Sequence, residues 1–235
     1  MKYSAKPGIK KTGLSFLCVF LIIFIVAMKD APSKKTYSYL ALGDSYTIGE
    51  KVSAAENFPS QVVRMMGEKE RNFSAPKIIA TTGWTTGELQ AAINKTRLKK
   101  KYDFVTLLIG VNNQYRGLKV VDYIPEFEHL LQQAIRFAGN DTSHVVVLSI
   151  PDWGVTPFAE GRDRAQIAKD IDAYNAANLL ITEKYNVHYI DITPGTRKAA
   201  ADPSLLATDG LHPSGKAYGE WATEICKYLL SKTEK

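Results

Sequence analysis

The chain has 235 residues, of which 45% are hydrophobic and 23% are charged, so it is long enough to bury a sizeable core as one domain. Its formal net charge of +6 is uneven, because four lysines precede the first apolar run and the chain after residue 28 carries 26 basic and 24 acidic residues. A body this close to neutral gives no electrostatic reason to expect a nucleic-acid partner.

The N-terminus has the order of a secretory signal, with Lys2, Lys6, Lys10 and Lys11 ahead of an apolar run from Leu14 to Met28. The 15 residues of this run reach ~22 Å as a helix, which is short of the ~30 Å hydrocarbon core of a membrane. We therefore expect residues 1–35 to be a signal peptide, or an uncleaved membrane anchor, followed by a polar linker. The protein would then be exported to the periplasm or the exterior, with its functional domain over residues 36–235 and membrane association through residues 14–28.

The two cysteines offer no disulfide within that domain. Cys18 lies inside the apolar run after bulky Phe16 and Leu17, which favours a residue of the signal over a lipid attachment site. Cys226 is then alone in the body, so stability has to come from packing.

Five strand-like apolar runs follow the linker. They alternate with helical patterns, which predicts βαβ units and a mainly parallel sheet. The runs are Tyr37–Leu42, Lys77–Ala80, Phe104–Ile109, His144–Ile150 and Val187–Ile190.

Helical spacings of three and four residues fall between and after these runs. Pro59 suits the first turn of one helix and Thr86 the cap of the next. The remaining helices are marked by apolar positions: Ile124, Phe127, Leu131 and Ile135, then Ile167, Ile171, Tyr174, Ala177 and Ile181, and finally Ala217, Trp221, Ile225 and Leu229. The stretch Trp153–Arg164 fits neither period and is expected to be a loop near the site.

The first strand ends in Gly43-Asp44-Ser45, which places a serine at the carboxyl edge of the sheet. Open α/β folds bind their ligands at this edge, and a serine there is a candidate nucleophile. The alternative is that Asp44 and Ser45 only cap the following segment.

Among four histidines, His212 has the surroundings of a general base. Pro213 fixes the backbone of His212, and Asp209 lies three residues back across a glycine turn. Asp209 can accept a bond from one imidazole nitrogen and leave the other free to take the proton of Ser45. The alternative is a turn with a capping acid before the last helix. His129, His144 and His188 are expected to be structural or solvated.

Two more strand ends carry donors for an oxyanion. Gly83 follows the second strand and can offer a backbone N–H, and Asn112 follows the third and can offer its amide. With the N–H of Ser45 they would form an oxyanion hole, although glycine and asparagine are also common turn residues.

Taken in order, Gly43-Asp44-Ser45, Gly83, Gly110-Val111-Asn112 and Asp209-Gly210-Leu211-His212 resemble the motifs of the SGNH (GDSL) hydrolases over about residues 36–232. The resemblance implies a flavodoxin-like three-layer α/β/α sandwich with Ser45, His212 and Asp209 as the catalytic triad. It also implies an oxyanion hole of Ser45, Gly83 and Asn112. One departure is Asn113, where the third block of the family usually ends in Asp.

The expected function is that of an exported serine esterase acting through an acyl-enzyme, on short-acyl or carbohydrate esters. The other candidates are a lipase or lysophospholipase, a carbohydrate-binding relative without catalysis, and a flavin or phosphate binder suggested by the loop Thr82–Gly87. That loop follows the second strand, whereas phosphate loops of flavodoxin type follow the first. Residues expected to contact substrate are Asp44, Trp84, Asn113, Tyr115 and Trp153, with Phe158 on the same loops. No cluster has the spacing of metal ligands, and we expect no metal or cofactor.

Overall fold

The computed structural model describes residues 1–5, 8 and 35–233. The chain divides into two units, Met1–Lys34 and Lys35–Lys235. The predicted leader, including the apolar run 14–28 and Cys18, falls almost wholly outside the described residues. In the part of the chain that the structure describes, none of the helices combines the length and apolar character that crossing a membrane requires.

The second unit is built on a five-stranded sheet in which every neighbouring pair is parallel. The strand order is β4 (Lys77–Thr81), β2 (Tyr39–Asp44), β5 (Phe104–Leu108), β6 (Val145–Leu148) and β7 (His188–Ile190). Every residue of the three inner strands is buried, as expected of apolar strands covered on both faces. The predicted α/β fold with a five-stranded parallel sheet is confirmed.

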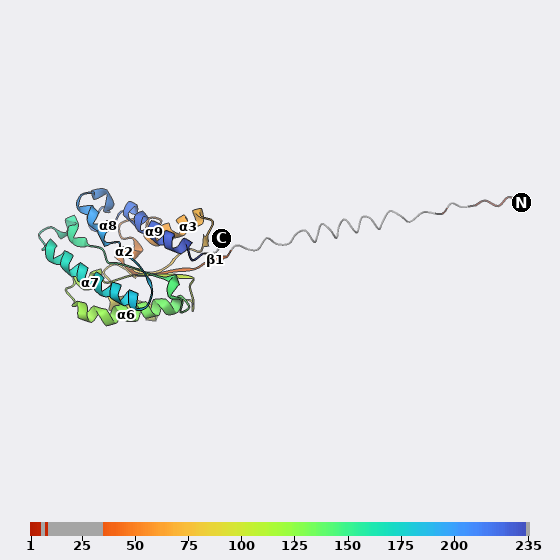
Figure 1. Ribbon diagram of the computed structural model, residues 1–235. Coiled ribbons are helices and arrows are strands. Elements are labelled where there is room, and N and C mark those ends of the chain that lie inside the picture. The colour runs from red at the N-terminus through yellow and green to blue at the C-terminus, as the bar shows by residue number, and fades with distance from the viewer. Residues whose placement is uncertain (6–7, 9–34, 234–235) are drawn as a thin grey trace. The chain divides into compact units, whose positions relative to one another are not determined.

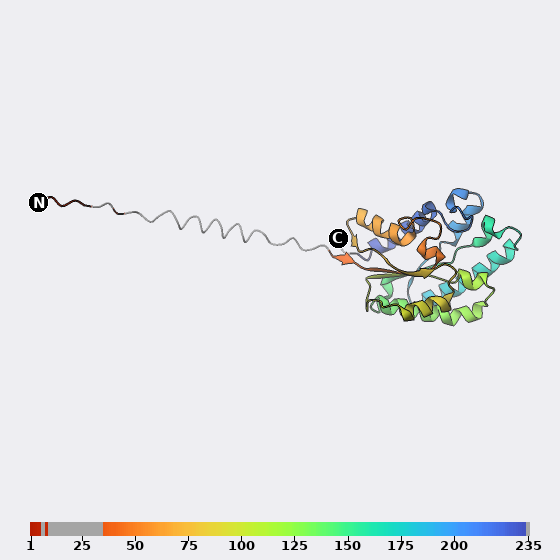
Figure 2. The same ribbon diagram turned by 180° about the vertical axis from the view of Figure 1, so that it is seen from behind.

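Helices cover both faces of the sheet and make the three layers seen in Figures 1 and 2. One face carries α3 (Phe58–Glu68) and α9 (Gly215–Leu230), which pack against each other. The other carries α4 (Thr86–Lys95), α6 (Val120–Phe137) and α7 (Arg164–Lys184). The predicted face of α9 is confirmed, since Ala217, Trp221, Ile225 and Leu229 are all buried.

Short elements follow the strands at the carboxyl edge of the sheet. The short α-helices are α2 (Ser45–Ile48), α5 (Val111–Tyr115) and α8 (Thr193–Arg197). The stretch predicted as a loop contains two 3₁₀ turns, η2 (Trp153–Val155) and η3 (Pro157–Ala159). Further 3₁₀ turns are η1 (Thr142–His144), η4 (Lys198–Ala200) and η5 (Pro203–Leu205).

Two local predictions are corrected. The first apolar run is split, because Ser38 bonds through its N–H and hydroxyl to Asp103, each at 2.7 Å. Residues Thr36–Tyr37 form β1, which pairs with β3 (Asn72–Phe73) in a separate parallel ribbon. The N-cap of α4 is Thr85 in place of Thr86, and the carboxylate of Glu88 accepts the Thr85 N–H at 2.8 Å.

Candidate active site

Ser45 begins α2 directly after the central strand β2, and its side chain is almost buried, with 3% of the residue exposed. Asp44 is the N-cap of α2 and accepts the Tyr46 N–H at 3.0 Å, so the capping role considered for Asp44 is present. Gly43 is required by close packing. A Cβ at this position would lie 2.5 Å from the Leu108 carbonyl oxygen and 2.1 Å from the Thr47 hydroxyl. Gly43 has no left-handed backbone, so the close approach of Leu108 and Thr47, and not a special turn, accounts for the glycine.

Asp209 and His212 are joined in the loop before α9. The Nδ1 atom of His212 lies 2.7 Å from Oδ2 of Asp209, and Oδ1 accepts the N–H groups of Leu211 and His212 at 3.0 Å each. Partial burial raises the pKa of Asp209, but these bonds outweigh it and hold the pKa below its ordinary value. The carboxylate therefore fixes the imidazole with Nδ1 protonated and Nε2 available as an acceptor.

The Ser45 hydroxyl and Nε2 of His212 line the same pocket, but within the described residues no hydrogen bond joins them. Catalytic hydrogen bonds are often long without substrate and tighten when it binds. The ring of Tyr46 packs against the imidazole of His212 with centroids 5.0 Å apart, so both Tyr46 and Asp209 hold this imidazole in place.

Gly83 and Asn112 approach Ser45 from two other strand ends. Gly83 follows β4 with φ +82°, and its carbonyl accepts Nη2 of Arg116 at 2.5 Å. The Nδ2 atom of Asn112 donates to the Trp84 carbonyl at 3.0 Å and to Oδ2 of Asp44 at 3.3 Å. The hydrogen bond to Asp44 is the longer and weaker of the two, so it is the one that Asn112 would break in order to donate to an oxyanion in the pocket.

One pocket of about 140 Å³ collects these groups. Ser45, Gly83, Asn112 and His212 of the predicted triad and oxyanion hole line it together, and so do Tyr115, Trp153 and Phe158, which were expected near the substrate. The rest of the lining is Tyr46, Thr82, Val111 and Leu211. These residues come from five separate segments of the chain, which the strand order brings together at one edge of the sheet.

Three aromatic side chains form one wall of this pocket. Tyr115 lies 5.2 Å from Trp153 and 6.1 Å from Phe158 between ring centroids. Trp153 is buried and donates its Nε1–H to Gln114 Oε1 at 2.7 Å, whereas Tyr115 and Phe158 remain 44% and 45% exposed. The guanidinium of Arg162 lies 6.0 Å from the Tyr115 ring. A rigid inner aromatic and two exposed outer ones give the pocket an apolar rim.

Three residues expected to contact substrate lie outside this lining. Trp84 contributes its carbonyl as an acceptor for Asn112. Asp44 is fully buried beneath α2, and Asn113 is bonded to Thr86 through both ends of its amide. Their contacts assign them to holding the elements of the site in place, and the structure gives none of them a surface toward the pocket.

Burial raises the pKa of Asp44 to about 7, against the opposing effect of its bonds from Tyr46 and Asn112. This is a large shift for a carboxyl group with two hydrogen bonds to it. It places the ionisation of Asp44 near neutral pH, beside the amide that would bind the oxyanion.

Sequence reasoning missed Tyr46, Val111, Leu211 and Arg116. The first three are apolar or aromatic neighbours of motif residues, and the sequence carries no signal that separates them from core residues. Among the described residues there is no group of three or more His, Cys, Asp or Glu side chains that could hold a metal ion.

A family model described as the GDSL-like lipase/acylhydrolase family matches residues 41–219. This is the family that the four sequence motifs resemble. No curated protein matches the chain significantly.

Solved structures with the same fold include a lipase/acylhydrolase from Enterococcus faecalis, which is 21% identical with a TM-score of 0.64 over 84% of this chain and 97% of that one. TesA is 15% identical with a TM-score of 0.66, over 85% of this chain and 100% of its own. Axe2, an acetylxylan esterase from Geobacillus stearothermophilus, is 18% identical with a TM-score of 0.62, over 83% and 93%. At sequence identities this low, the structural similarity establishes a shared fold only.

Proposed function

The chain belongs to the GDSL-like lipase/acylhydrolase family and is a hydrolase of ester bonds, and from this premise we propose that it is an exported serine esterase working through an acyl-enzyme on Ser45. His212 is the general base, Asp209 orients it, and Ser45, Gly83 and Asn112 bind the oxyanion. The single observation that carries the proposal is the convergence of Ser45, Gly83, Asn112 and His212 on one pocket, with Asp209 bonded to His212 at 2.7 Å.

The first half of the reaction follows from these positions. The Ser45 hydroxyl oxygen attacks the ester carbonyl carbon while Nε2 of His212 takes the hydroxyl proton. The negative charge on the carbonyl oxygen is stabilised by the N–H groups of Ser45 and Gly83 and by Nδ2 of Asn112, each worth ~10²–10³ in rate. The tetrahedral intermediate collapses, His212 returns its proton to the alcohol oxygen, and the alcohol leaves.

The second half repeats these steps with water. Nε2 of His212 takes a proton from a water molecule, whose oxygen attacks the acyl carbon on Ser45. The same donors hold the oxyanion, and His212 then protonates Ser45 as the carboxylic acid departs. The bond from Nδ1–H to Asp209 leaves Nε2 as the atom that takes and returns each proton, and it stabilises the imidazolium that forms.

We place the substrate among short-acyl esters, with a carbohydrate as the alcohol. The pocket around Ser45 is small, and the half-exposed rings of Tyr115 and Phe158 at its rim suit stacking on a sugar. The structural neighbour Axe2 is an acetylxylan esterase. A lipase or lysophospholipase activity is the competing proposal, favoured by the apolar segment 14–28 and by the lipase/acylhydrolase named among the neighbours.

Export is proposed on the sequence alone, from the lysines and the apolar run that follows them.

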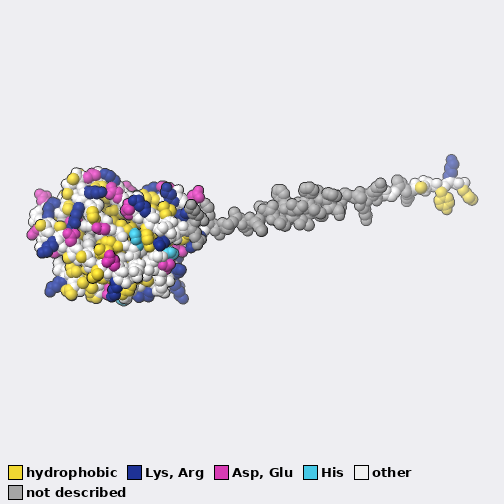
Figure 3. Space-filling model, viewed as in Figure 1, with side chains coloured by type: hydrophobic (Ala, Val, Ile, Leu, Met, Phe, Trp, Pro, Cys, Tyr) yellow, Lys and Arg dark blue, Asp and Glu magenta, His cyan; other side chains and the backbone are white. Residues whose placement is uncertain are grey.

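The near-neutral net charge of the chain after residue 28 agrees with a small-molecule substrate. Figure 3 shows basic, acidic and apolar side chains interspersed over the face in view, with no extended area of one charge sign.

The nucleophile is tested by labelling with a fluorophosphonate, mapping the modified residue, and assaying Ser45→Ala. We expect a single adduct on Ser45, and a loss of esterase activity in the variant of at least ~10³-fold. The matched control is Thr47→Ser, which changes a buried side chain of the same helix outside the pocket lining. This variant should still be labelled on Ser45. Turnover retained in Ser45→Ala would show that another residue is the nucleophile, and an unlabelled wild type would favour a binding protein.

A further inference from the structure

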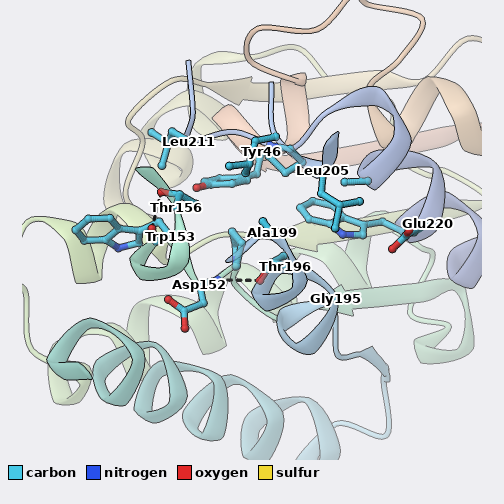
Figure 4. A pocket seen from close by; sticks show the side chains of 15 residues that line it. Tyr46, Asp152, Trp153, Thr156, Gly195, Thr196, Ala199, Leu205, Leu211 and Glu220 are labelled. Atoms are coloured by element: carbon cyan, nitrogen blue, oxygen red, sulfur yellow. Dashed lines mark hydrogen bonds between the residues drawn. The ribbon is translucent and has the colours of Figure 1, made fainter. Parts of the chain in front are cut away.

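A second cavity lies behind the pocket that contains Ser45. It measures about 20 Å³ and is lined mainly by apolar side chains, from residues 151–156, the α8–η5 region and the start of α9, with the carboxylates Asp152 and Glu220 also in the lining (Figure 4). Its innermost wall includes Ala199, Leu205, Leu206, Ala217 and Trp221. The reaction proposed above uses none of these five residues.

Only a thin wall separates this cavity from the pocket. Tyr46, Trp153 and Leu211 belong to both linings, so their side chains form the partition. Figure 4 shows Tyr46 and Leu211 on the same side of the cavity, with Trp153 beyond Thr156. An acyl chain on Ser45 that runs toward this side of the pocket would end against these three residues.

The three residues of the partition differ in what else they do. Trp153 is held by its bond to Gln114, and Tyr46 packs on the imidazole of His212. The side chain of Leu211 is aliphatic and half-buried, so it lines the pocket without hydrogen bonds, and its backbone N–H donates to Asp209. Leu211 is thus the member of the partition whose side chain can change without altering the Trp153 hydrogen bond or the ring packed on His212.

The backbone around Leu211 is fixed independently of its side chain. Ala207 N–H donates to the His212 carbonyl at 2.7 Å, and Phe158 N–H donates to the Gly210 carbonyl at 3.2 Å. Leu206 and Pro213 form an antiparallel bridge at the base of the loop. Shortening the side chain would leave this loop in place and join the two spaces.

We propose that Leu211 sets the length of the acyl chain that the enzyme accepts, and that the cavity behind it is a latent subsite for longer alkyl chains. A narrow, mainly apolar space favours methylene groups over a sugar hydroxyl, because a polar group that enters it gains few hydrogen bonds. Each methylene that enters it raises kcat/KM about fourfold, which corresponds to ~0.8 kcal/mol of transfer free energy. This inference rests on the proposed role of Ser45 as the nucleophile.

The test is the chain-length profile of p-nitrophenyl esters from two to ten carbons, measured on the full chain and on Leu211→Ala. We expect wild type to favour two to four carbons. Leu211→Ala should raise kcat/KM for hexanoate relative to acetate by about tenfold or more, as two additional methylenes are accommodated. Leu211→Phe should have the opposite effect and lower kcat/KM for the butyrate ester relative to that for the acetate ester.

The matched control is Leu206→Ala, which removes the same atoms from the cavity's far wall and leaves the partition intact. Its chain-length profile should coincide with that of wild type. An unchanged profile in Leu211→Ala, an equal shift in Leu206→Ala, or a wild type that already prefers ten carbons would each overturn the inference.

Failure of the inference and failure of the proposed function give different results. A wild type that labels on Ser45 and hydrolyses esters, with a profile that no Leu211 variant moves, rejects only the role of Leu211. A wild type that neither labels nor hydrolyses any ester rejects both. If circular dichroism shows that Leu211→Ala does not fold, the chain-length profiles of Leu211→Val and Leu211→Phe are compared with that of wild type instead.

Discussion

Asp44 lies next to the proposed nucleophile in the chain and yet has no exposed surface. Its Oδ1 caps α2 through Tyr46, and its Oδ2 accepts the amide of Asn112. The carboxyl group of Asp44 therefore connects the helix that carries Ser45 with Asn112, a proposed donor of the oxyanion hole. Since burial raises its pKa to about 7, the strength of this connection changes near neutral pH.

The stability of the protein should report this ionisation. The folded pKa of about 7 lies above the ordinary value of 3.8, so between these values the folded state keeps a proton that the unfolded state releases. Stability contributed by Asp44 is therefore full below pH 3.8 and is lost as pH rises toward about 7. Relative to Asp44→Asn, wild type should lose ~2–4 kcal/mol of unfolding free energy across this window and then level off.

Urea unfolding of both proteins at several pH values between 4 and 8 measures the difference. All other titrating groups are common to the two proteins, so the difference isolates Asp44. A difference that stays constant with pH, or that grows in favour of wild type as pH rises, would contradict the raised pKa.

The residues that form the pocket could be predicted to meet because each follows a strand of a parallel sheet or precedes the last helix. The sequence could not predict which of their side chains face the pocket. Asn112 and Asn113 are consecutive in α5, and successive helical residues point about 100° apart, so one enters the lining and the other bonds to Thr86. The phase of such a short helix depends on tertiary contacts, which the sequence does not reveal.

At the scale of elements, Asn113 joins the helices α4, α5 and α6. Its Oδ1 accepts the Thr86 N–H at 3.0 Å, and its Nδ2 donates to the Thr86 hydroxyl at 2.7 Å. The hydroxyl of Thr86 in turn donates to the carboxylate of Glu126. Because Thr86 has a single hydroxyl proton and gives it to Glu126, residue 113 has to be a donor. This accounts for asparagine where the family usually has aspartate.

Asn113→Asp should destabilise the protein by ~1–3 kcal/mol, because the buried carboxylate at position 113 would compete with Glu126 for the one hydroxyl proton of Thr86. The unfolding free energy by urea denaturation measures the loss. Asn94→Asp makes the same exchange on the exposed surface of α4 and should cost less than ~0.5 kcal/mol.

A second substitution tests the cause. Glu126→Gln supplies an amide that can donate to Thr86, so Asn113→Asp combined with Glu126→Gln should recover most of the stability that Asn113→Asp alone loses. Strict additivity of the two substitutions would mean that the three residues do not form one chain of hydrogen bonds.

Elements with a long apolar period were predictable, and short ones were not. The spacing of four in α9 indicates its buried face directly, and the continuous apolar runs indicate β5 and β6. The ribbon of β1 and β3 has two residues on each side and no period to detect. Its pairing depends instead on Ser38 and Asp103, which interrupt the first run through a contact 65 residues apart.

At the scale of the whole molecule, the main hydrophobic core is contained in the second unit. Its members run from Tyr37 to Leu229, and they include no described residue of the first unit. The strands, the covering helices and every residue of the proposed site also lie after Lys34. The substrate could not be predicted at this scale, because the pocket walls come from loops whose lengths and residues do not follow from the sheet.

A chain of residues 35–235 should therefore fold and act as the full chain does. We expect its melting temperature to agree with that of the full protein within about 2 °C, because no core contact is removed. Its kcat/KM on a soluble p-nitrophenyl ester should agree within about twofold. A chain starting at residue 45 is the matched control, since it lacks β2, the strand between β4 and β5, and should not fold. Loss of activity in the 35–235 chain would show that the N-terminal residues belong to the working enzyme, beyond any role in export.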